Sequence, residues 1–406
     1  MEELNEQRRR TTTPAIAPIV HLWILRILMP LGGHRELVRP RGFKEEGVAR
    51  VLGLEKWIDP EDFDFDPAVV RTRLRELHRQ AERTAERALP AVLEANLKRL
   101  AALVGMSDTE CRILGFATML HHERDLDSAA DTLGALSSSA IVDVLAALLD
   151  LPEHEVRGAL SIQGVLARSG LLSVDRSGTK LLRGKLDLLS DQFADSILKS
   201  ESDPVVLLRD MVAPSTPARL SLADFSHLDE ALAILKPYLA QAVAGSQQGV
   251  NIFVYGAPGT GKSELARALA AVLECELFEV ASEDEDGDPV TGERRLRAYR
   301  AAQSFFDRRR AMLLFDEVED VFGDSGNRFG LHSTAQRRKA WLNRTLEQNR
   351  VPTLWLSNSI DGIDPAFMRR FDVLVEVQVP PRAQRERILQ ATCGDLAGAP
   401  TLARMA

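Results

Sequence analysis

One short segment constrains the fold of this chain more than any other feature of its sequence. The segment consists of Gly256, Ala257, Pro258, Gly259, Thr260, Gly261, Lys262 and Ser263. It matches the pattern GxxxxGK[ST] and lies between an apolar run, 250–255, and a helical stretch, 262–273. Its glycines let successive backbone N–H groups point at a phosphate, at the positive end of the helix that follows. The sequence therefore predicts a strand, a phosphate-binding loop and a helix, in this order.

The polar residues of this segment have expected roles toward ATP and Mg²⁺. Lys262 would reach the β- and γ-phosphates, and the hydroxyl of Ser263 would ligate the metal ion. We expect the other residues of the segment, together with Glu264, to complete the nucleotide-binding set. ATP and Mg²⁺ are therefore the predicted ligands.

A second apolar run, 311–315, leads directly into Asp316 and Glu317. A carboxylate at the end of a buried strand lies beside the phosphate-binding loop, where Asp316 would hold Mg²⁺ through water. Glu317 is placed to orient and deprotonate the attacking water. Together with the loop, this acidic pair predicts a site that hydrolyses ATP.

Apolar runs alternate with helical stretches through the C-terminal half of the chain. The runs expected to form strands are 250–255, 277–280, 312–315, 353–356 and 373–379. The helical stretches between them include 262–273, 294–308 and 334–349. Such alternation builds a parallel sheet with helices on both faces. We therefore predict the α/β fold of P-loop NTPases, with five parallel strands, over residues 218–380.

Residues 69–202 show helical spacing of their apolar side chains and few β-branched runs, which predicts an all-α domain. Within it, 151–182 resembles a winged helix, with a hairpin of 171–174 and 180–182 around the turn 175–178. Basic and acidic residues nearly balance in this segment, whereas binding to DNA phosphates needs a basic excess. The charge pattern favours a domain that packs or recruits a protein, and DNA binding remains an alternative.

The remaining segments of the chain give weaker structural signals. Residues 1–68 have no clear assignment, and 203–217 is typical of a linker because it carries three prolines among polar residues. Ser107 and Glu110 have the spacing of a capping box, which predicts the start of a helix.

The chain has 406 residues, with 51 basic and 59 acidic side chains and a formal net charge of −8. Its hydrophobic fraction of 45% and charged fraction of 27% exclude a disordered or fibrous chain. The apolar stretch 15–31 follows three arginines, as in a signal peptide, but prolines, His21 and Arg26 interrupt it. The three cysteines form no CxxC pair. We therefore expect a cytoplasmic protein without a membrane segment.

Two further motifs follow the acidic pair. An apolar strand ends in Asn358, and the segment 363–372 contains the adjacent Arg369 and Arg370. With the phosphate-binding loop and the acidic pair, these motifs resemble the AAA ATPases over residues 220–389. The resemblance implies that Asn358 positions the lytic water and that both arginines stabilise the γ-phosphate in a neighbouring subunit. It also implies a homo-oligomeric ring, a hexamer in this family, that remodels a protein or protein complex recruited by the N-terminal domain.

The sequence departs from the AAA pattern in two places. The pair Gly292-Glu293 lacks the aromatic residue that precedes it in threading motors of the family, since 289–291 is Pro-Val-Thr. Residues 381–406 would provide only the start of the helical lid, so we expect a truncated lid, weak nucleotide binding and poor ring assembly. A nucleotide-dependent binding switch with little or no hydrolysis is therefore an alternative to the motor, as is a DNA-associated ATPase.

Overall fold

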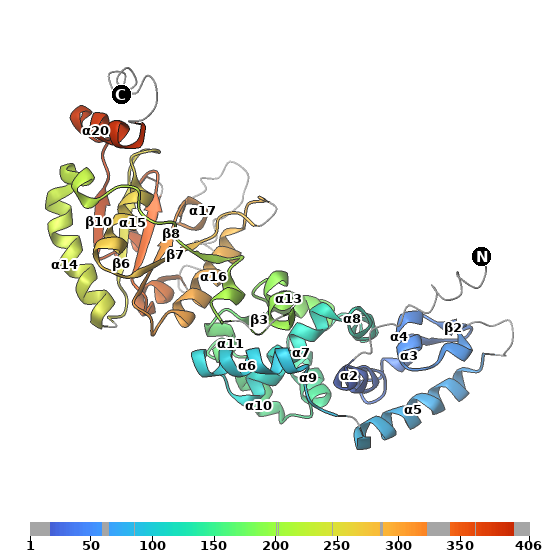
Figure 1. Cartoon of the computed structure of the whole chain (residues 1–406). Coiled ribbons are helices and arrows are strands. Elements are labelled where there is room, and N and C mark those ends of the chain that lie inside the picture. The colour runs from blue at the N-terminus through green and yellow to red at the C-terminus, as the bar shows by residue number, and fades with distance from the viewer. Residues whose placement is uncertain are drawn as a thin grey trace, which may run out of the picture. The chain divides into compact units, whose positions relative to one another are not determined.

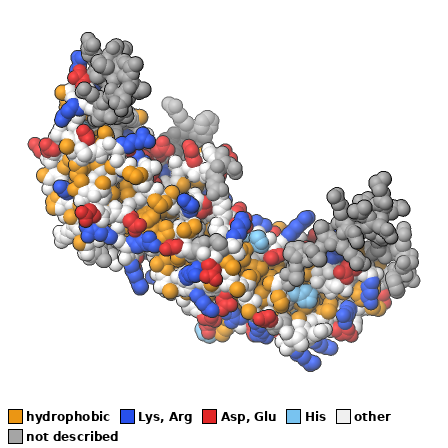
Figure 2. All heavy atoms as spheres, viewed as in Figure 1, with side chains coloured by type: hydrophobic (Ala, Val, Ile, Leu, Met, Phe, Trp, Pro, Cys, Tyr) orange, Lys and Arg blue, Asp and Glu red, His pale blue; other side chains and the backbone are white. Residues whose placement is uncertain are grey.

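The computed structural model of the chain divides it into two compact units, residues 1–207 and 208–406 (Figure 1). The residues that it describes are 17–58, 65–84, 86–199, 201, 203–245, 247–284, 287–322, 342–361 and 363–393. Lys and Arg side chains are interspersed with Asp and Glu over the face shown in Figure 2. This mixture agrees with the small excess of acidic residues in the sequence.

The N-terminal unit is built mainly from helices, which confirms the predicted helical region. They are α2 (Pro18–Leu28), α3 (His34–Leu37), α4 (Glu46–Val51), α5 (Pro67–Thr84), α6 (Ala91–Val104), α7 (Asp108–His122), α8 (Arg124–Asp131), α9 (Ala140–Leu149), α10 (Glu153–Ala159), α11 (Val165–Arg168), α12 (Leu182–Lys185) and α13 (Asp191–Lys199). Two small antiparallel ladders accompany them, β1 (Val38–Arg39) with β2 (Gly42–Phe43) and β3 (Leu172–Val174) with β4 (Leu186–Leu188). The 3₁₀ turn η1 (Glu55–Trp57) lies in this unit, and η2 (Val206–Leu208) spans the boundary to the next unit.

Helix α2 belongs to the core of this unit, where it packs against α5, α8 and α9. Nine of its eleven residues are buried, including Trp23, whose ring packs edge-on against Phe116 with centroids 5.1 Å apart. A helix that is apolar around most of its circumference is a core helix. Residues 18–28 of the stretch that resembles a signal peptide in the sequence therefore form part of the packed interior. Among the described residues, no helix is both long and apolar enough to cross a membrane.

Helix α7 begins at the capping box that the sequence predicts, so that prediction is confirmed. The hydroxyl of Ser107 accepts a hydrogen bond from the Glu110 N–H over 3.2 Å, and the Glu110 carboxylate accepts one from the Ser107 N–H over 2.9 Å. The other carboxylate oxygen of Glu110 accepts from the Val165 N–H over 2.7 Å. The same side chain therefore caps α7 and fixes the start of α11.

The predicted hairpin of the winged-helix-like segment is wrong in its second strand. β3 pairs with β4, with Leu172 opposite Leu188, whereas Lys180 forms an isolated bridge to Leu136. Lys180 is exposed, while Leu186 and Leu188 are buried at alternate positions. Residues 186–188 form the second strand in place of 180–182, because pairing them buries Leu186 and Leu188. The register of a strand depends more on which residues it buries than on the position of the nearest turn residues.

The side chain of Lys185 closes the turn between these two strands. Lys185 is fully buried, and its ammonium donates to the main-chain oxygens of Asp175, Ser177 and Gly178 over 2.8, 3.1 and 2.7 Å. Three backbone acceptors match the three donors of an ammonium group. The turn therefore depends on a lysine that lies beyond it in the sequence.

The C-terminal unit contains a six-stranded sheet in the order β10-β6-β9-β8-β7-β5. Its strands are β5 (Val212–Pro214), β6 (Asn251–Tyr255), β7 (Glu276–Val280), β8 (Ala311–Phe315), β9 (Thr353–Ser357) and β10 (Val373–Glu376). In the part of the chain that the structure describes, its helices are α14 (Asp229–Gly245), α15 (Lys262–Val272), α16 (Gly292–Phe305), α17 (Glu319–Phe322), α19 (Pro365–Met368) and α20 (Arg382–Cys393), with the 3₁₀ segment η3 (Leu222–Leu228) and a further helical segment at 342–348. β6 to β10 are parallel neighbours, which confirms the predicted α/β fold.

The sixth strand, β5, corrects the prediction of five strands and comes from the segment assigned as a linker. It pairs antiparallel with β7 at the edge of the sheet, with Val212 opposite Val280 and Pro214 opposite Phe278. Proline lacks the N–H that a central strand needs, but an edge strand tolerates it. The strand β5 has only three residues, one of them proline, so its apolar pattern is too short to indicate a strand in the sequence.

Both faces of the sheet are covered, and the core packs on each side. Leu354 of β9 faces the side covered by α14 and α15, where it joins Leu269 in one apolar cluster. Its neighbour Trp355 belongs to an aromatic group with Tyr299 of α16 and Phe315 of β8, each with its ring centroid 4.9 Å from that of Trp355. Because β9 lies between β6 and β8, the carboxyl ends of these three parallel strands meet at one edge.

Candidate nucleotide site

The loop between β6 and α15 has the backbone of an anion-binding site. Gly261, just before α15, has a φ of 92°, a left-handed conformation that strains side chains with a Cβ. At Gly256, a Cβ would collide with the main-chain oxygen of Val377, so the close approach of these two segments requires glycine. The first N–H groups of α15 have no partner within the helix and carry its positive dipole end. The loop therefore fits a phosphate chain.

The ammonium of Lys262 lies inside this loop. It donates to the main-chain oxygens of Gly256 and Ala257 over 2.8 and 3.2 Å, and to Oδ1 of Asn358 over 3.1 Å. Burial lowers the pKa of Lys262, although Asp316 and Glu319 act in the opposite direction. The structure thus brings together the loop lysine and Asn358, two residues far apart in the sequence.

Ser263 and Asp316 form the second contact of the site. The Ser263 hydroxyl donates to Oδ2 of Asp316 over 2.9 Å, and Oδ1 of Asp316 accepts from the Glu317 N–H over 2.8 Å. Hydroxyl and carboxylate oxygens are the hard donors that Mg²⁺ takes, usually with several waters. These two side chains therefore fit a magnesium site beside the phosphate-binding loop.

Glu317 is exposed and has a φ of 51°, which is uncommon for a residue other than glycine. Its main-chain oxygen accepts from Nη1 of Arg295 over 3.1 Å, and Nη2 of Arg295 donates to the main-chain oxygen of Asp316. Arg295 is only 2% exposed, and Nη1 also pairs with Asp320 over 3.0 Å. A buried guanidinium behind β8 thus supports the backbone of the acidic pair.

Glu319 connects the acidic pair to the strand that carries Asn358. Its Oε1 accepts hydrogen bonds from the Ser357 hydroxyl over 2.9 Å and from the Asn358 N–H over 2.5 Å. Sequence reasoning missed both Glu319 and Arg295 as parts of the site. The cluster of acidic residues directly after β8 could have indicated Glu319 as part of the site. No local pattern distinguishes Arg295 from the other arginines of its helix.

Other predicted nucleotide-binding residues lie around this centre. Residues 257–259, which include Pro258 and Gly259, are exposed, and the Thr260 hydroxyl donates to the main-chain oxygen of Ala257 over 2.9 Å. The Glu264 carboxylate accepts from the Arg219 N–H over 2.9 Å and from Arg267 over 2.8 Å. Burial raises the pKa of Glu264, but the hydrogen bonds from these donors lower the pKa by more than burial raises it. The pKa of Glu264 therefore lies below its ordinary value.

Arg369 and Arg370 do not belong to the hydrogen-bonded centre formed by the loop, Asp316 and Asn358 of the same chain. Both are exposed, at the end of α19, and Arg370 forms an ion pair with Glu347. Among the described residues, neither arginine has a hydrogen bond or ion pair with the phosphate-binding loop or the acidic pair. The structure therefore assembles the loop, Asp316, Glu317 and Asn358, and leaves the two arginines on the surface.

Comparison with known proteins gives matches over this same unit. Residues 252–379 match the family described as "ATPase family associated with various cellular activities (AAA)". The "26S proteasome regulatory subunit 10B" of Dictyostelium discoideum is 27% identical over 219 residues, which cover 48% of this chain and 52% of that protein. The "ATP-dependent zinc metalloprotease FtsH" of Ureaplasma parvum serovar 3 is 26% identical over 215 residues, or 48% of this chain and 28% of that protein.

Among solved structures, one match is to a chain of the "HORMA:CdnC:Trip13 complex" of E. coli MS115-1. It has a TM-score of 0.36 and 19% identity, and covers 48% of this chain and 81% of that chain. This chain spans about half the length of the proteasome subunits that it matches.

Proposed function

The chain carries an AAA ATPase domain over residues 252–379, and from the geometry of its site we propose that it binds ATP with Mg²⁺ and hydrolyses it to remodel a protein or protein complex. The observation that carries the proposal is the convergence of Lys262, Ser263, Asp316 and Asn358 at the carboxyl ends of β6, β8 and β9. The N-terminal unit would recruit the protein, and the work would take place in the cytoplasm.

Each residue of the site has a role that follows from its chemistry. Lys262 and the N–H groups at the start of α15 would bind the β- and γ-phosphates, and Ser263 and Asp316 would hold Mg²⁺. When bound, Mg²⁺ neutralises charge on the phosphate oxygens. Glu317 would accept a proton from the attacking water, because its carboxylate is exposed at the edge of the site. Asn358 would position that water.

The proposal includes a homo-oligomeric ring, a hexamer, in which Arg369 and Arg370 act in the neighbouring subunit's site. Both arginines are exposed, and neither forms a hydrogen bond or ion pair with the described residues of their own chain's loop, which suits a role in trans. A guanidinium supplied to the γ-phosphate stabilises the charge of the transition state. Hydrolysis would then require neighbours, and the rate per subunit would depend on assembly.

The proposal is tested by steady-state ATP hydrolysis over a wide range of protein concentration. We expect the specific activity to rise steeply as rings assemble. Glu317→Gln should abolish hydrolysis and retain ATP binding, whereas Lys262→Ala should lose both. Flat activity near zero together with ATP binding would contradict the motor and assign a nucleotide-dependent binding switch. Salt-sensitive stimulation by DNA would instead assign a DNA-associated ATPase.

A further inference from the structure

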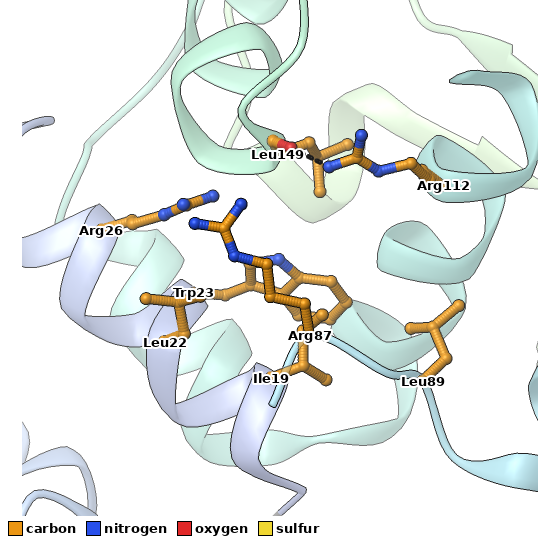
Figure 3. A pocket seen from close by; sticks show the side chains of 8 residues that line it. All are labelled: Ile19, Leu22, Trp23, Arg26, Arg87, Leu89, Arg112 and Leu149. Atoms are coloured by element: carbon orange, nitrogen blue, oxygen red, sulfur yellow. Dashed lines mark hydrogen bonds between the residues drawn. The ribbon is translucent and has the colours of Figure 1, made fainter. Parts of the chain in front are cut away.

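The N-terminal unit contains a cavity of about 260 Å³ that is separate from the nucleotide site. Its apolar wall consists of Ile19, Leu22, Trp23, Leu89 and Leu149. The remaining lining side chains are three arginines, and no carboxylate of the described residues lines the cavity. Figure 3 shows the three guanidinium groups toward one side of the pocket, with Ile19, Leu89 and the Trp23 ring toward the other. A pocket that combines cations with an apolar wall suits a ligand with the opposite charge and a matching apolar part.

Two of the arginines are held by carboxylates that lie outside the lining. Arg26 is 5% exposed and binds Glu82 through Nε and Nη2 over 2.6 and 2.9 Å, while Nη1 donates to the main-chain oxygen of Leu148 over 2.8 Å. Arg87 contacts Asp150 over 3.1 Å and Glu82 over 3.4 Å. These two charges are therefore compensated, and the pairs fix both guanidinium groups in place.

The third arginine, Arg112 on α7, has no carboxylate partner. Its Nη2 donates to the main-chain oxygen of Leu149, and Arg112 forms no ion pair with an acidic residue of the part of the chain that the structure describes. Arg112 is half-buried, so water compensates its charge less fully than on an open surface. A guanidinium has five N–H donors in a planar fork that matches a carboxylate. Arg112 is thus the anion-binding position of the pocket.

The apolar wall is rigid enough to select its ligand. Trp23 is 3% exposed, and its ring stands at 89° to that of Phe116. Leu22 and Leu149 are almost completely buried, whereas Arg87 is about half-exposed at the rim. Side chains already held by packing lose little freedom on binding. The cavity is smaller than the pockets of about 300–1,000 Å³ that hold drug-sized ligands, so it suits a group the size of one amino-acid residue.

We propose that this pocket binds a carboxylate carried on an apolar group, such as the C-terminal residue of a polypeptide that ends in leucine. The carboxylate contacts Arg112, with Arg87 beside it at the rim, and the apolar group packs against Trp23. The pocket belongs to the N-terminal unit and needs no nucleotide. Its binding is therefore independent of the proposed ATP hydrolysis.

The test measures fluorescence anisotropy of a fluorescein-labelled pentapeptide that ends in leucine, with the full-length chain and without nucleotide. The peptide with a free C-terminal carboxylate should bind at least about tenfold more tightly than the same peptide as its C-terminal amide, because only the acid forms charge-assisted hydrogen bonds. Equal affinity of acid and amide, or no binding of either at about 1 mM, overturns the proposal.

Two variants locate the binding to this pocket. Arg112→Gln should reduce the affinity for the acid to that for the amide, and Arg87→Gln, at the exposed rim, should reduce it by a smaller factor. Arg50→Gln is the matched control, because Arg50 is an exposed arginine of the same unit that pairs with Glu46. Thermal unfolding of each variant checks the fold. A folded Arg112→Gln protein that binds the acid as tightly as the parent would refute the assignment.

A competition experiment distinguishes two sources of the same chemistry. Displacement of the peptide by N-acetyl-leucine at equal concentration assigns the pocket to a small carboxylic acid. If the unlabelled peptide with a free C-terminal carboxylate displaces the labelled peptide and N-acetyl-leucine does not, the pocket is assigned to a polypeptide C-terminus. ATP hydrolysis is measured on the same preparations. A protein that hydrolyses ATP but binds no peptide contradicts only the peptide pocket, whereas a protein that binds peptide but does not hydrolyse ATP contradicts only the proposed ATPase.

Discussion

Arg295 donates from Nη1 to the main-chain oxygen of Glu317 over 3.1 Å, across 22 positions of the sequence. Glu317 adopts a left-handed φ of 51°, and such a conformation costs about 1–2 kcal/mol for a residue with a Cβ. The buried guanidinium stabilises that conformation and pairs with Asp320. The direction of the Glu317 side chain therefore depends on a residue of α16.

Replacement of Arg295 by methionine should affect both stability and hydrolysis. It leaves two main-chain oxygens and the Asp320 carboxylate without their donor, which should lower the free energy of unfolding by about 2–3 kcal/mol. Hydrolysis should fall at least about tenfold because Glu317 is misplaced, with little change in ATP affinity. Urea unfolding and steady-state kinetics measure the two effects. Arg294→Met, at an exposed position of the same helix, is the control, and equal behaviour of both variants would contradict the role of Arg295.

Variants of Glu319 distinguish an effect on the position of Asn358 from an effect on folding more clearly than a variant of Arg295 does. Glu319→Ala removes the acceptor for the Ser357 hydroxyl and the Asn358 N–H, so kcat should fall about tenfold while ATP affinity changes little. Glu319→Gln keeps an acceptor oxygen and should recover much of the activity. Single-turnover hydrolysis with bound ATP reports this difference. If the alanine and glutamine variants were equally impaired, the hydrogen bonds to Oε1 would not be the cause.

Lys185 should be essential for the stability of the N-terminal unit. Lys185→Met removes a buried ammonium that donates to three main-chain oxygens, which should lower the free energy of unfolding by about 2–3 kcal/mol. Chemical unfolding followed by circular dichroism measures this change. Lys199→Met, at an exposed position on α13, should stay within about 0.5 kcal/mol of the parent. A similarly small effect at Lys185 would show that water replaces its ammonium.

The ion pair between Arg26 and Glu82 predicts a pH dependence of stability. Hydrogen bonds from Arg26 hold the pKa of Glu82 below its ordinary range, despite an opposing effect of burial. A carboxyl group with a depressed folded pKa stabilises the protein above its unfolded pKa of about 4.3, and this contribution is lost as the pH falls through the folded pKa. Glu82→Gln should therefore destabilise the protein at pH 7 and progressively less toward pH 2.

Urea unfolding at several pH values tests this expectation for Glu82→Gln. The matched control is Glu94→Gln, since Glu94 forms an exposed pair with Lys98 on α6. Destabilisation by Glu82→Gln of equal size at pH 7 and pH 2 would rule out the ionic contribution and leave only packing.

Arg370 tests whether sites are shared between subunits. Its ion pair with Glu347 is exposed on both sides, so releasing the guanidinium to a neighbouring chain costs little. Arg370→Ala and Glu317→Gln should each be inactive alone. Mixing the two should restore part of the hydrolysis, because a ring can then place an intact Arg370 opposite an intact Glu317. No recovery in mixed rings, confirmed by co-purification of tagged and untagged chains, would place the action of Arg370 within its own chain.

The phosphate-binding loop and the parallel strands could be predicted because their determinants are local. Strands buried on both faces are apolar at nearly every position, as in 311–315, and loop glycines are required by the backbone at their own positions. The capping box of Ser107 and Glu110 is local in the same sense. The hairpin prediction failed where a local turn signal competed with the burial of Leu186 and Leu188.

The sequence by itself determined the α/β fold of the C-terminal unit, the helical character of the N-terminal region, and the order of the motifs that predict the site. Only the tertiary structure decided which side chains support them. Glu319 reaches Asn358 across 39 positions, and Arg295 reaches Glu317 from another helix. These contacts, like the pocket around Trp23, join segments that are remote in the chain. Hydrogen bonds and ion pairs depend on distances between atoms, and the packing of strands and helices sets those distances.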